Sequence, residues 1–169
     1  MSAPVRNQRV DGTAAEDLAA RFLENHGIRI VERNWRWRGG EIDLIGIEPP
    51  ASGSATPPRV LFVEVKLRRS VRHGTPEEAV GYRKRATIAQ AARAWLARTG
   101  GSDRPVRFDV VGIRPNRGEV PGGPGASETW GDADVTPPQG QGDGRTVVGV
   151  DADGKWRLRW TSGAFRPEF

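Results

Sequence analysis

Two acidic residues and one lysine interrupt segments that otherwise have the apolar alternation of β-strands. The segment EIDLIGI contains Asp43, and the segment RVLFVEVKLR contains Glu64 and Lys66. Because side chains alternate across a strand, Glu64 and Lys66 share a face with Phe62, while Leu61 and its alternate residues occupy the other face. If the two strands pair with their apolar faces aligned, Asp43 lies near Glu64 and Lys66.

This alignment assumes that Ile42 and Leu44 share one face of their strand, with Asp43 on the opposite face. Two facing carboxylates repel by ~4 kcal/mol at 4 Å and an effective dielectric constant of 20. Water, the lysine or a divalent cation would offset this repulsion. Hard cations such as Mg²⁺ prefer carboxylate oxygens and keep several waters. Two acids that hold a metal, beside a lysine that assists the attacking water, suit phosphodiester hydrolysis.

The same pattern has a simpler interpretation. An antiparallel strand with one hydrated face also alternates apolar and polar residues. The spacing of Asp43, Glu64 and Lys66 does not by itself separate a solvated strand face from an active site.

Composition excludes several classes of site. The 169 residues are enough for one domain with its own core. The chain has no cysteine and two histidines, which excludes disulfides, thiolate zinc sites and histidine-rich metal sites. No apolar run approaches the ~20 residues of a membrane span, and the N-terminus lacks the apolar core of a secretory signal. We therefore expect a cytoplasmic protein with no membrane partner.

Charge is unevenly distributed along the chain. Residues 66–107 contain eleven Lys or Arg against three Asp or Glu, whereas residues 108–154 contain eight Asp or Glu against three Arg. A basic block of this kind is typical of a surface that binds a polyanion, and it also occurs on an ordinary uneven surface.

The periodicity predicts how these residues are positioned. A helix is expected over residues 13–27, with Thr13 as its N-cap and Gly27 at its end. Strands are expected over residues 28–35, 41–47 and 59–68, the last two antiparallel across a Pro/Ser loop at 49–58. A second helix is expected from Thr75, with Pro76 at its first position and Glu78 in a capping box.

The rest of the chain predicts a further strand, an insertion and a hairpin. A strand at 106–113 ends the core domain of residues 11–113, and residues 114–145 are expected to be a disordered Gly/Pro-rich insertion. Residues 146–169 are expected to complete the same domain with a hairpin. This order predicts an α/β fold in which helices flank a mixed β-sheet.

The motifs GGEIDLIGIE, LFVEVKLRRSVRHGTPEEAV and YRKRATIAQAARAWL closely resemble the YraN family of uncharacterised bacterial proteins, as do TAAEDLAARFLENHGIRIVERNWRWR and RFDVVGI. The resemblance covers about residues 12–113. That family is similar to restriction endonucleases and archaeal Holliday-junction resolvases, which implies a restriction-endonuclease-like fold. It also implies that Asp43, Glu64 and Lys66 form a PD-(D/E)xK nuclease core that uses Mg²⁺ or Mn²⁺. Junction resolvases act as dimers, and that analogy implies a homodimer.

Further residues match the family and have alternative interpretations. Glu16 corresponds to a helix glutamate that junction resolvases add to the metal site, but it also forms a capping box with Thr13. Glu41 is either a third acid or a solvated strand-end charge. Lys84 is either a phosphate contact or part of a solvated helix face. Asn34 and Arg36 match the family pattern without an assigned role.

Three arginines follow the strand that carries Glu64, and they suit contacts to a nucleic-acid backbone. They are Arg68, Arg69 and Arg72. Tryptophans alternate with arginines in two other segments, where they could stack on bases. We favour the alternative in which the tryptophans face the core and the arginines lie outside. These are Trp35, Trp37, Trp156 and Trp160, with Arg36, Arg38, Arg157 and Arg159.

Three functions are compatible with these features. The first is a metal-dependent nuclease acting on DNA rather than RNA, including branched or single-stranded DNA. The second is a nucleic-acid-binding or adaptor protein that keeps the fold without turnover. The third is a partner-binding protein whose acidic insertion is the functional part.

Overall fold

The computed structural model describes residues 8–68, 76, 78–116 and 145–166, with the side chains of residues 8–11 left out of the description. Its helices are α1 (Gln8–Asn25) and α2 (Tyr82–Thr99). Its strands are β1 (Arg29–Trp37), β2 (Gly40–Glu48), β3 (Arg59–Leu67), β4 (Val106–Pro115), β5 (Thr146–Val150) and β6 (Trp156–Thr161). Among these residues, no helix is both long and apolar enough to cross a membrane.

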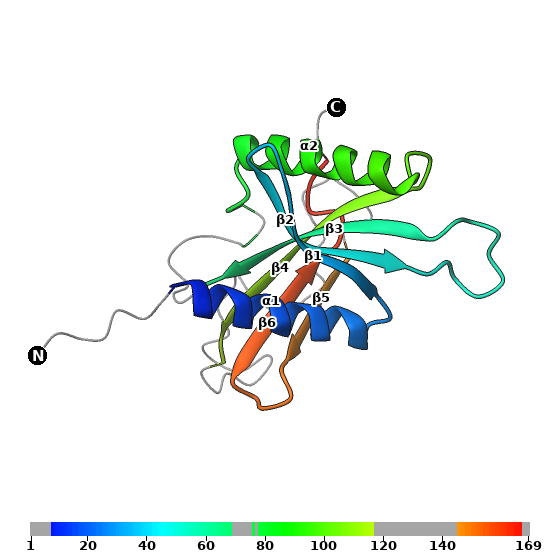
Figure 1. Ribbon diagram of the computed structural model, residues 1–169. Helices are drawn as coiled ribbons and strands as arrows, with labels where there is room; N and C mark the ends of the chain where they lie inside the picture. The colour runs from blue at the N-terminus through cyan, green and yellow to red at the C-terminus, as the bar shows by residue number, and fades with distance from the viewer. Residues whose placement is uncertain (1–7, 69–75, 77, 117–144, 167–169) are drawn as a thin grey trace, which may run out of the picture.

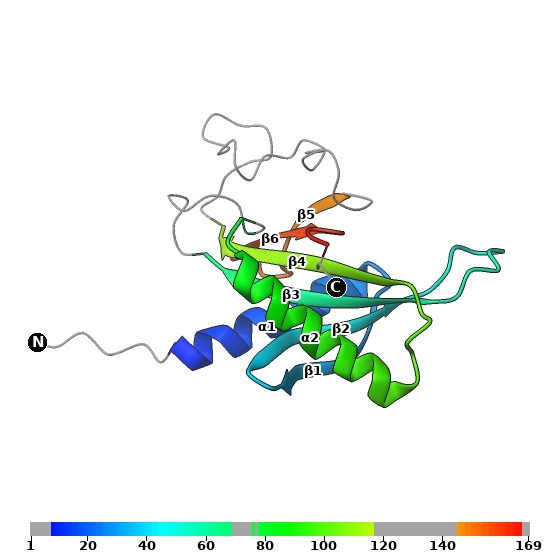
Figure 2. The same cartoon turned by 90° about the horizontal axis from the view of Figure 1, so that it is seen from above.

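The strands form one mixed sheet in the order β1-β2-β3-β4-β6-β5. Only the β3–β4 pair is parallel, and α2 lies in the chain between these two strands. The other neighbours pair antiparallel. Figures 1 and 2 show α1 and α2 on opposite faces of the sheet. The α/β fold with a mixed sheet flanked by helices is therefore confirmed.

Each helix packs on its own hydrophobic core. The α1 core joins that helix to alternate residues of the central strands, and its members include Ala19, Leu23, Leu44, Leu61, Val63, Val111 and Leu158. The α2 core occupies the other face, and its members include Ile42, Ile45, Phe62, Ile88, Ala92, Trp95 and Phe108. Strand β3 alternates as predicted, because Leu61 and Val63 face α1 while Phe62 faces α2. The face that carries Glu64 therefore lies under α2.

The beginnings of both helices differ from the prediction. Helix α1 begins at Gln8, so Thr13 lies within it and does not cap it. Helix α2 begins at Tyr82 after Gly81, whose extended backbone provides no side-chain cap bond. Pro76 lies in a turn before the helix, and Thr75 lies outside the described residues. The predicted capping residues therefore start neither helix.

The β1–β2 hairpin reaches from the sheet to α2. Its two-residue loop, Arg38 and Gly39, has positive φ at both positions (43° and 79°), which is the geometry of a type I′ turn. At the hairpin end, a Cβ atom on Gly40 would lie 2.5 Å from the Thr87 carbonyl oxygen of α2. Glycine at position 40 therefore allows the hairpin to pack directly on the helix that covers the candidate site.

The C-terminal hairpin, β5 and β6, joins the sheet through the pairing of β6 with β4. Strand β4 continues to Pro115, so Arg114 belongs to the sheet and not to the predicted insertion. Residues 117–144, most of that insertion, lie outside the described residues. The prediction that the arginines of β6 lie outside is wrong, because Arg157 and Arg159 are only 2% and 5% exposed.

The prediction for the tryptophans is confirmed at three of four positions. Trp160 is buried, Trp156 packs against the α1 core and Trp35 packs against the α2 core. Trp37 is the exception: it is 43% exposed, with the Arg38 guanidinium 5.5 Å from its ring centroid. Position 37 directly precedes the hairpin turn at Arg38 and Gly39.

Candidate active site

Asp43 lies at the end of the pairing between β2 and β3. The ladder ends with Leu44 opposite Val63. Beyond that pair, Asp43 Oδ2 accepts a hydrogen bond from the Val65 backbone N–H at 2.7 Å. The side chain thus takes the place of a backbone ladder partner, which holds the carboxylate beside β3.

Glu64 is a buried carboxylate that two lysines contact. Its side chain is 5% exposed. Lys66 Nζ, from the same face of β3, donates to Glu64 Oε1 at 2.6 Å. Lys84 Nζ, from α2, lies 3.2 Å from Glu64 Oε2. The sheet and the covering helix therefore bring one ammonium group to each oxygen of this carboxylate.

The electrostatic environment of Asp43 favours its neutral form. Burial raises the pKa of Asp43 to about 7, and the negative charge of Glu64 acts in the same direction. The hydrogen bond from Val65 and the charge of Lys84 oppose this rise, while Glu16 adds to it. Asp43 and Glu64 thus form a strongly interacting acid pair that a cation would stabilise in its fully ionised form.

The oxygen donors of this pair fit a hard divalent cation. Glu64 Oε2 is buried and accepts no hydrogen bond, since Lys84 approaches it at ion-pair distance without hydrogen-bond geometry. A buried carboxylate oxygen without a hydrogen bond is costly unless another group binds it. Within the described part of the chain, no three His, Cys, Asp or Glu side chains gather closely enough to hold a metal ion. The fit is therefore to a cation held by two carboxylates with water in its remaining positions.

Glu16 does not join Asp43 and Glu64 in a three-acid cluster, and its capping-box interpretation is also wrong. Because Thr13 lies inside α1, Glu16 has no helix start to cap. Its Oε2 instead accepts a hydrogen bond from Asn34 Nδ2 at 3.0 Å. Glu16 is therefore oriented toward the β1–β2 hairpin, near enough to Asp43 for its charge to affect that carboxyl.

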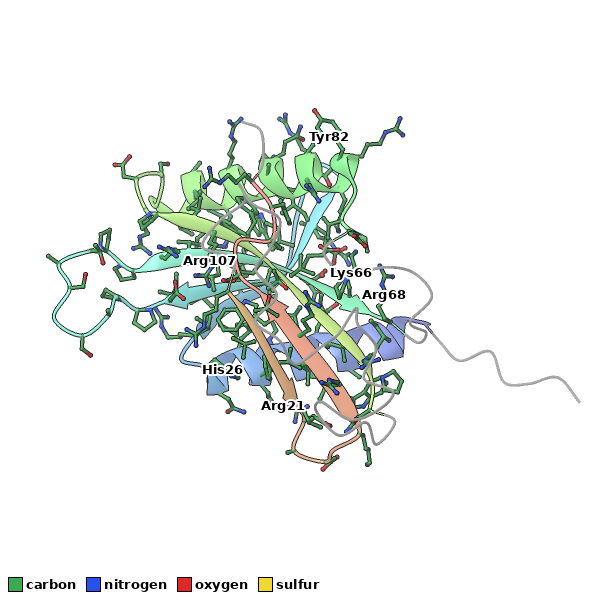
Figure 3. All side chains as sticks on the ribbon, turned by 180° about the vertical axis from the view of Figure 1, so that it is seen from behind. Arg21, His26, Lys66, Arg68, Tyr82 and Arg107 are labelled. Atoms are coloured by element: carbon green, nitrogen blue, oxygen red, sulfur yellow. The ribbon has the colours of Figure 1, made fainter. Side chains whose placement is uncertain are left out.

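The remaining predicted residues lie at different distances from the acid pair. Glu41 accepts two hydrogen bonds from the Arg36 guanidinium across the hairpin, so it forms a surface ion pair. Lys84 belongs to the pair's immediate surroundings and not to a solvated helix face. Figure 3 shows Arg68 close to Lys66 at one end of β3. Arg69 and Arg72 lie outside the described residues.

Asn34 is the residue whose importance the sequence reasoning missed. It lies in the middle of β1 with a φ of 53°, in the left-handed region that non-glycine residues seldom adopt. Asn tolerates this region better than most residues, but nothing in the alternation of the RIVERNW segment indicates a break there. Its contact with Glu16 depends on the packing of α1 against β1.

Comparison with known proteins places this arrangement in a family. The model of a family described as "Uncharacterised protein family UPF0102" matches residues 15–113. The chain belongs to the UPF0102 family. This is the YraN family that the sequence motifs resemble, so that prediction is confirmed.

UPF0102 relatives are similar over most of their own length. The chain is 43% identical to a UPF0102 protein of Nocardia farcinica over 119 residues, which are 70% of this chain and 87% of the relative. It is 46% identical to a UPF0102 protein of Symbiobacterium thermophilum over 104 residues, 62% of this chain and 81% of the relative. The UPF0102 match spans the segment from Glu16 to Lys84 and leaves out the C-terminal hairpin. Because the family is uncharacterised, an argument about function depends on the site itself.

Proposed function

We propose that this protein is a metal-dependent nuclease that hydrolyses phosphodiester bonds of DNA, including branched or single-stranded DNA. The observation that carries the proposal is the joint position of Asp43 and Glu64, with Lys66 and Lys84 in contact with the second acid. This combination of a cation site and fixed ammonium groups is what a phosphoryl-transfer site requires.

The chain's own groups have distinct roles in this proposal. Asp43 and Glu64 would hold Mg²⁺ or Mn²⁺, which when bound supplies a water of lowered pKa and neutralises charge on the phosphate. Lys66 is held in place by its 2.6 Å contact with Glu64, so it can orient a water or a phosphate oxygen. Lys84 places a second positive charge at the same carboxylate from α2.

A nucleic-acid partner is supported by the charge around the site. Arg68 directly follows the last residue of β3, close to Lys66, and its buried Nε atom has no hydrogen-bond partner. Arginine and lysine side chains that contact phosphates position nucleic acid without reading its sequence. We expect binding to weaken steeply with salt, because each phosphate contact releases counterions.

The decisive experiment measures cleavage by the purified full-length protein. Labelled single-stranded, duplex and four-way-junction DNA are incubated with Mg²⁺ or Mn²⁺ and with wild type, Asp43→Asn or Glu64→Gln. We expect either substitution to reduce cleavage by about 10³-fold or more, because an essential group of the site is removed. Glu41→Gln is the matched control, since it neutralises an acid of the same strand that pairs with Arg36. Equal cleavage by all variants would refute the proposal.

A second function is favoured by one feature of the site. Two lysines already contact Glu64, so its charge is offset without any metal. A nucleic-acid-binding protein without turnover needs no more than this. That alternative predicts that wild type binds DNA, cleaves none of the substrates and binds no divalent cation at the acid pair.

A further inference from the structure

The β1–β2 hairpin changes faces part-way along its length. On one side of this point, which we call the turnover of the hairpin, paired residues face α1, and on the other side they face α2. Arg33 is paired with Leu44, and Leu44 belongs to the α1 core. Two residues further along, Trp35 is paired with Ile42, and both pack in the α2 core. A regular strand would keep Ile42 and Leu44 on one face. The expectation that they share a face is therefore wrong.

Asn34 and Asp43 lie opposite each other at this turnover, since their neighbours on both sides are paired. The positive φ of Asn34 provides the backbone break in β1. Glycine adopts such a conformation with less strain than asparagine. The backbone requirement alone would therefore be met by glycine, and the carboxamide of Asn34 needs a separate explanation.

The carboxamide contacts an acid whose charge affects Asp43 but which is not part of the Asp43–Glu64 pair. Asn34 Nδ2 donates to Glu16 Oε2, which joins α1 to the turnover of the hairpin. Within the described residues Glu16 does not form a three-acid cluster with Asp43 and Glu64, yet its charge raises the pKa of Asp43. A divalent cation that keeps several waters can be contacted through one of them.

We propose that Asn34 is a positioning residue that orients Glu16 toward a water of the divalent cation bound by Asp43 and Glu64. This inference rests on the proposed function, because it assumes that the acid pair binds a cation. Groups that orient the immediate ligands of a metal commonly change its affinity by about 10–100-fold when mutated. Asn34 and Glu16 act here as one unit that α1 contributes to a site built by the sheet.

The test is Mn²⁺ binding by the full-length protein, followed from the EPR signal of free Mn²⁺. Asn34→Gly keeps the backbone conformation accessible and removes the carboxamide, so thermal unfolding of this variant should remain cooperative. We expect Asn34→Gly and Glu16→Gln each to weaken Mn²⁺ binding by about 10-fold or more. The double variant should bind no more weakly than Glu16→Gln alone, because the two side chains act together. Asp17→Asn, the neighbouring acid on α1, should bind as wild type does.

The possible outcomes separate this inference from the proposed nuclease. Wild-type affinity in Asn34→Gly would show that Asn34 serves only the backbone and would overturn the inference, whatever the cleavage assay gives. Weakened binding in Asn34→Gly and Glu16→Gln without DNA cleavage by wild type would support the positioning role and refute the nuclease. Absence of Mn²⁺ binding by wild type would overturn both.

Discussion

Two aspartates of the sheet, Asp109 and Asp43, differ in burial and in surroundings, because Asp109 is fully buried and Asp43 is only partly buried. Asp109 is fully buried on β4 and accepts four hydrogen bonds: two from Arg107, one from Trp160 Nε1 and one from the Gly163 backbone N–H. Asp43 accepts one backbone hydrogen bond and has Glu64 and Glu16 as negative neighbours. Figure 3 shows that Arg107 and Lys66, which mark the two regions, lie well apart.

The difference shows what separates a structural carboxylate from a candidate catalytic one. Burial raises the pKa of both groups, but at Asp109 the bound guanidinium and the N–H donors oppose the rise. The Asp109 network joins β4 to β6 and to the C-terminal turn, and it needs nothing further. The Asp43–Glu64 pair has no such network: two lysines contact Glu64, whose Oε2 atom accepts no hydrogen bond, and Asp43 has two acids as neighbours.

The largest expected effect is the loss of stability on breaking the Asp109 network. Asp109→Asn leaves the guanidinium of Arg107 buried with one fewer carboxylate, and we expect the free energy of unfolding to fall by about 3–5 kcal/mol. Urea denaturation followed by tryptophan fluorescence measures this change. A loss below about 1 kcal/mol would mean that Glu48, the other partner of Arg107, is a sufficient counterion.

A smaller change is expected at the candidate site, where replacing Asp43 should raise the free energy of unfolding instead of lowering it. Asp43 keeps its proton up to about pH 7 in the folded protein, whereas the unfolded chain releases it near 3.8. The folded state thus binds more protons between these values, and wild-type stability falls as pH rises through the window. Asp43→Asn removes this loss of stability. Above pH 7 the free energy of unfolding of the variant should therefore exceed that of wild type by about 1–3 kcal/mol, after allowance for solvent screening.

Measuring urea denaturation at pH 4 and pH 8 tests this expectation. At pH 4 the two proteins should be nearly equal, because Asp43 is protonated in the folded state. Mg²⁺ should raise the stability of wild type at pH 8 and leave Asp43→Asn unchanged, since only an intact acid pair binds it. A variant less stable than wild type at pH 8 without metal would place Asp43 with Asp109 among the structural carboxylates.

The smallest effect is expected one residue away from Glu16. Asp17 forms an exposed ion pair with Arg33, and both side chains are more than 40% exposed. Exposed pairs contribute about 0.2–1 kcal/mol, so Asp17→Asn should change the free energy of unfolding by no more than that. It should also leave Mn²⁺ affinity unchanged. A weakening comparable to that of Glu16→Gln would mean that general charge on α1, and not the oriented Glu16, affects the site.

The sequence predicted the sheet, its flanking helices, the approach of Asp43 to Glu64 and the contact of Lys66 with Glu64. It did so because β3 alternates strictly and pairs antiparallel with β2, which precedes it in the chain across the loop at 49–58. The route to that result was partly wrong, since Ile42 and Leu44 lie on opposite faces. The predicted position of Asp43 beside Glu64 was nevertheless correct, because β2 and β3 pair in regular register from Leu44 to Glu48.

By itself, the sequence determined which residues could form a site and which apolar stripes each helix would bury, because both follow from local periodicity. Only the tertiary structure decided that Lys84 contacts Glu64, that Asn34 holds Glu16 and that the hairpin turns over between them. These features depend on contacts between α1, α2 and the hairpin, which are distant in sequence. The two-residue alternation of a strand sequence does not predict the close packing of the hairpin on Thr87. It does not predict the positive φ of Asn34 either.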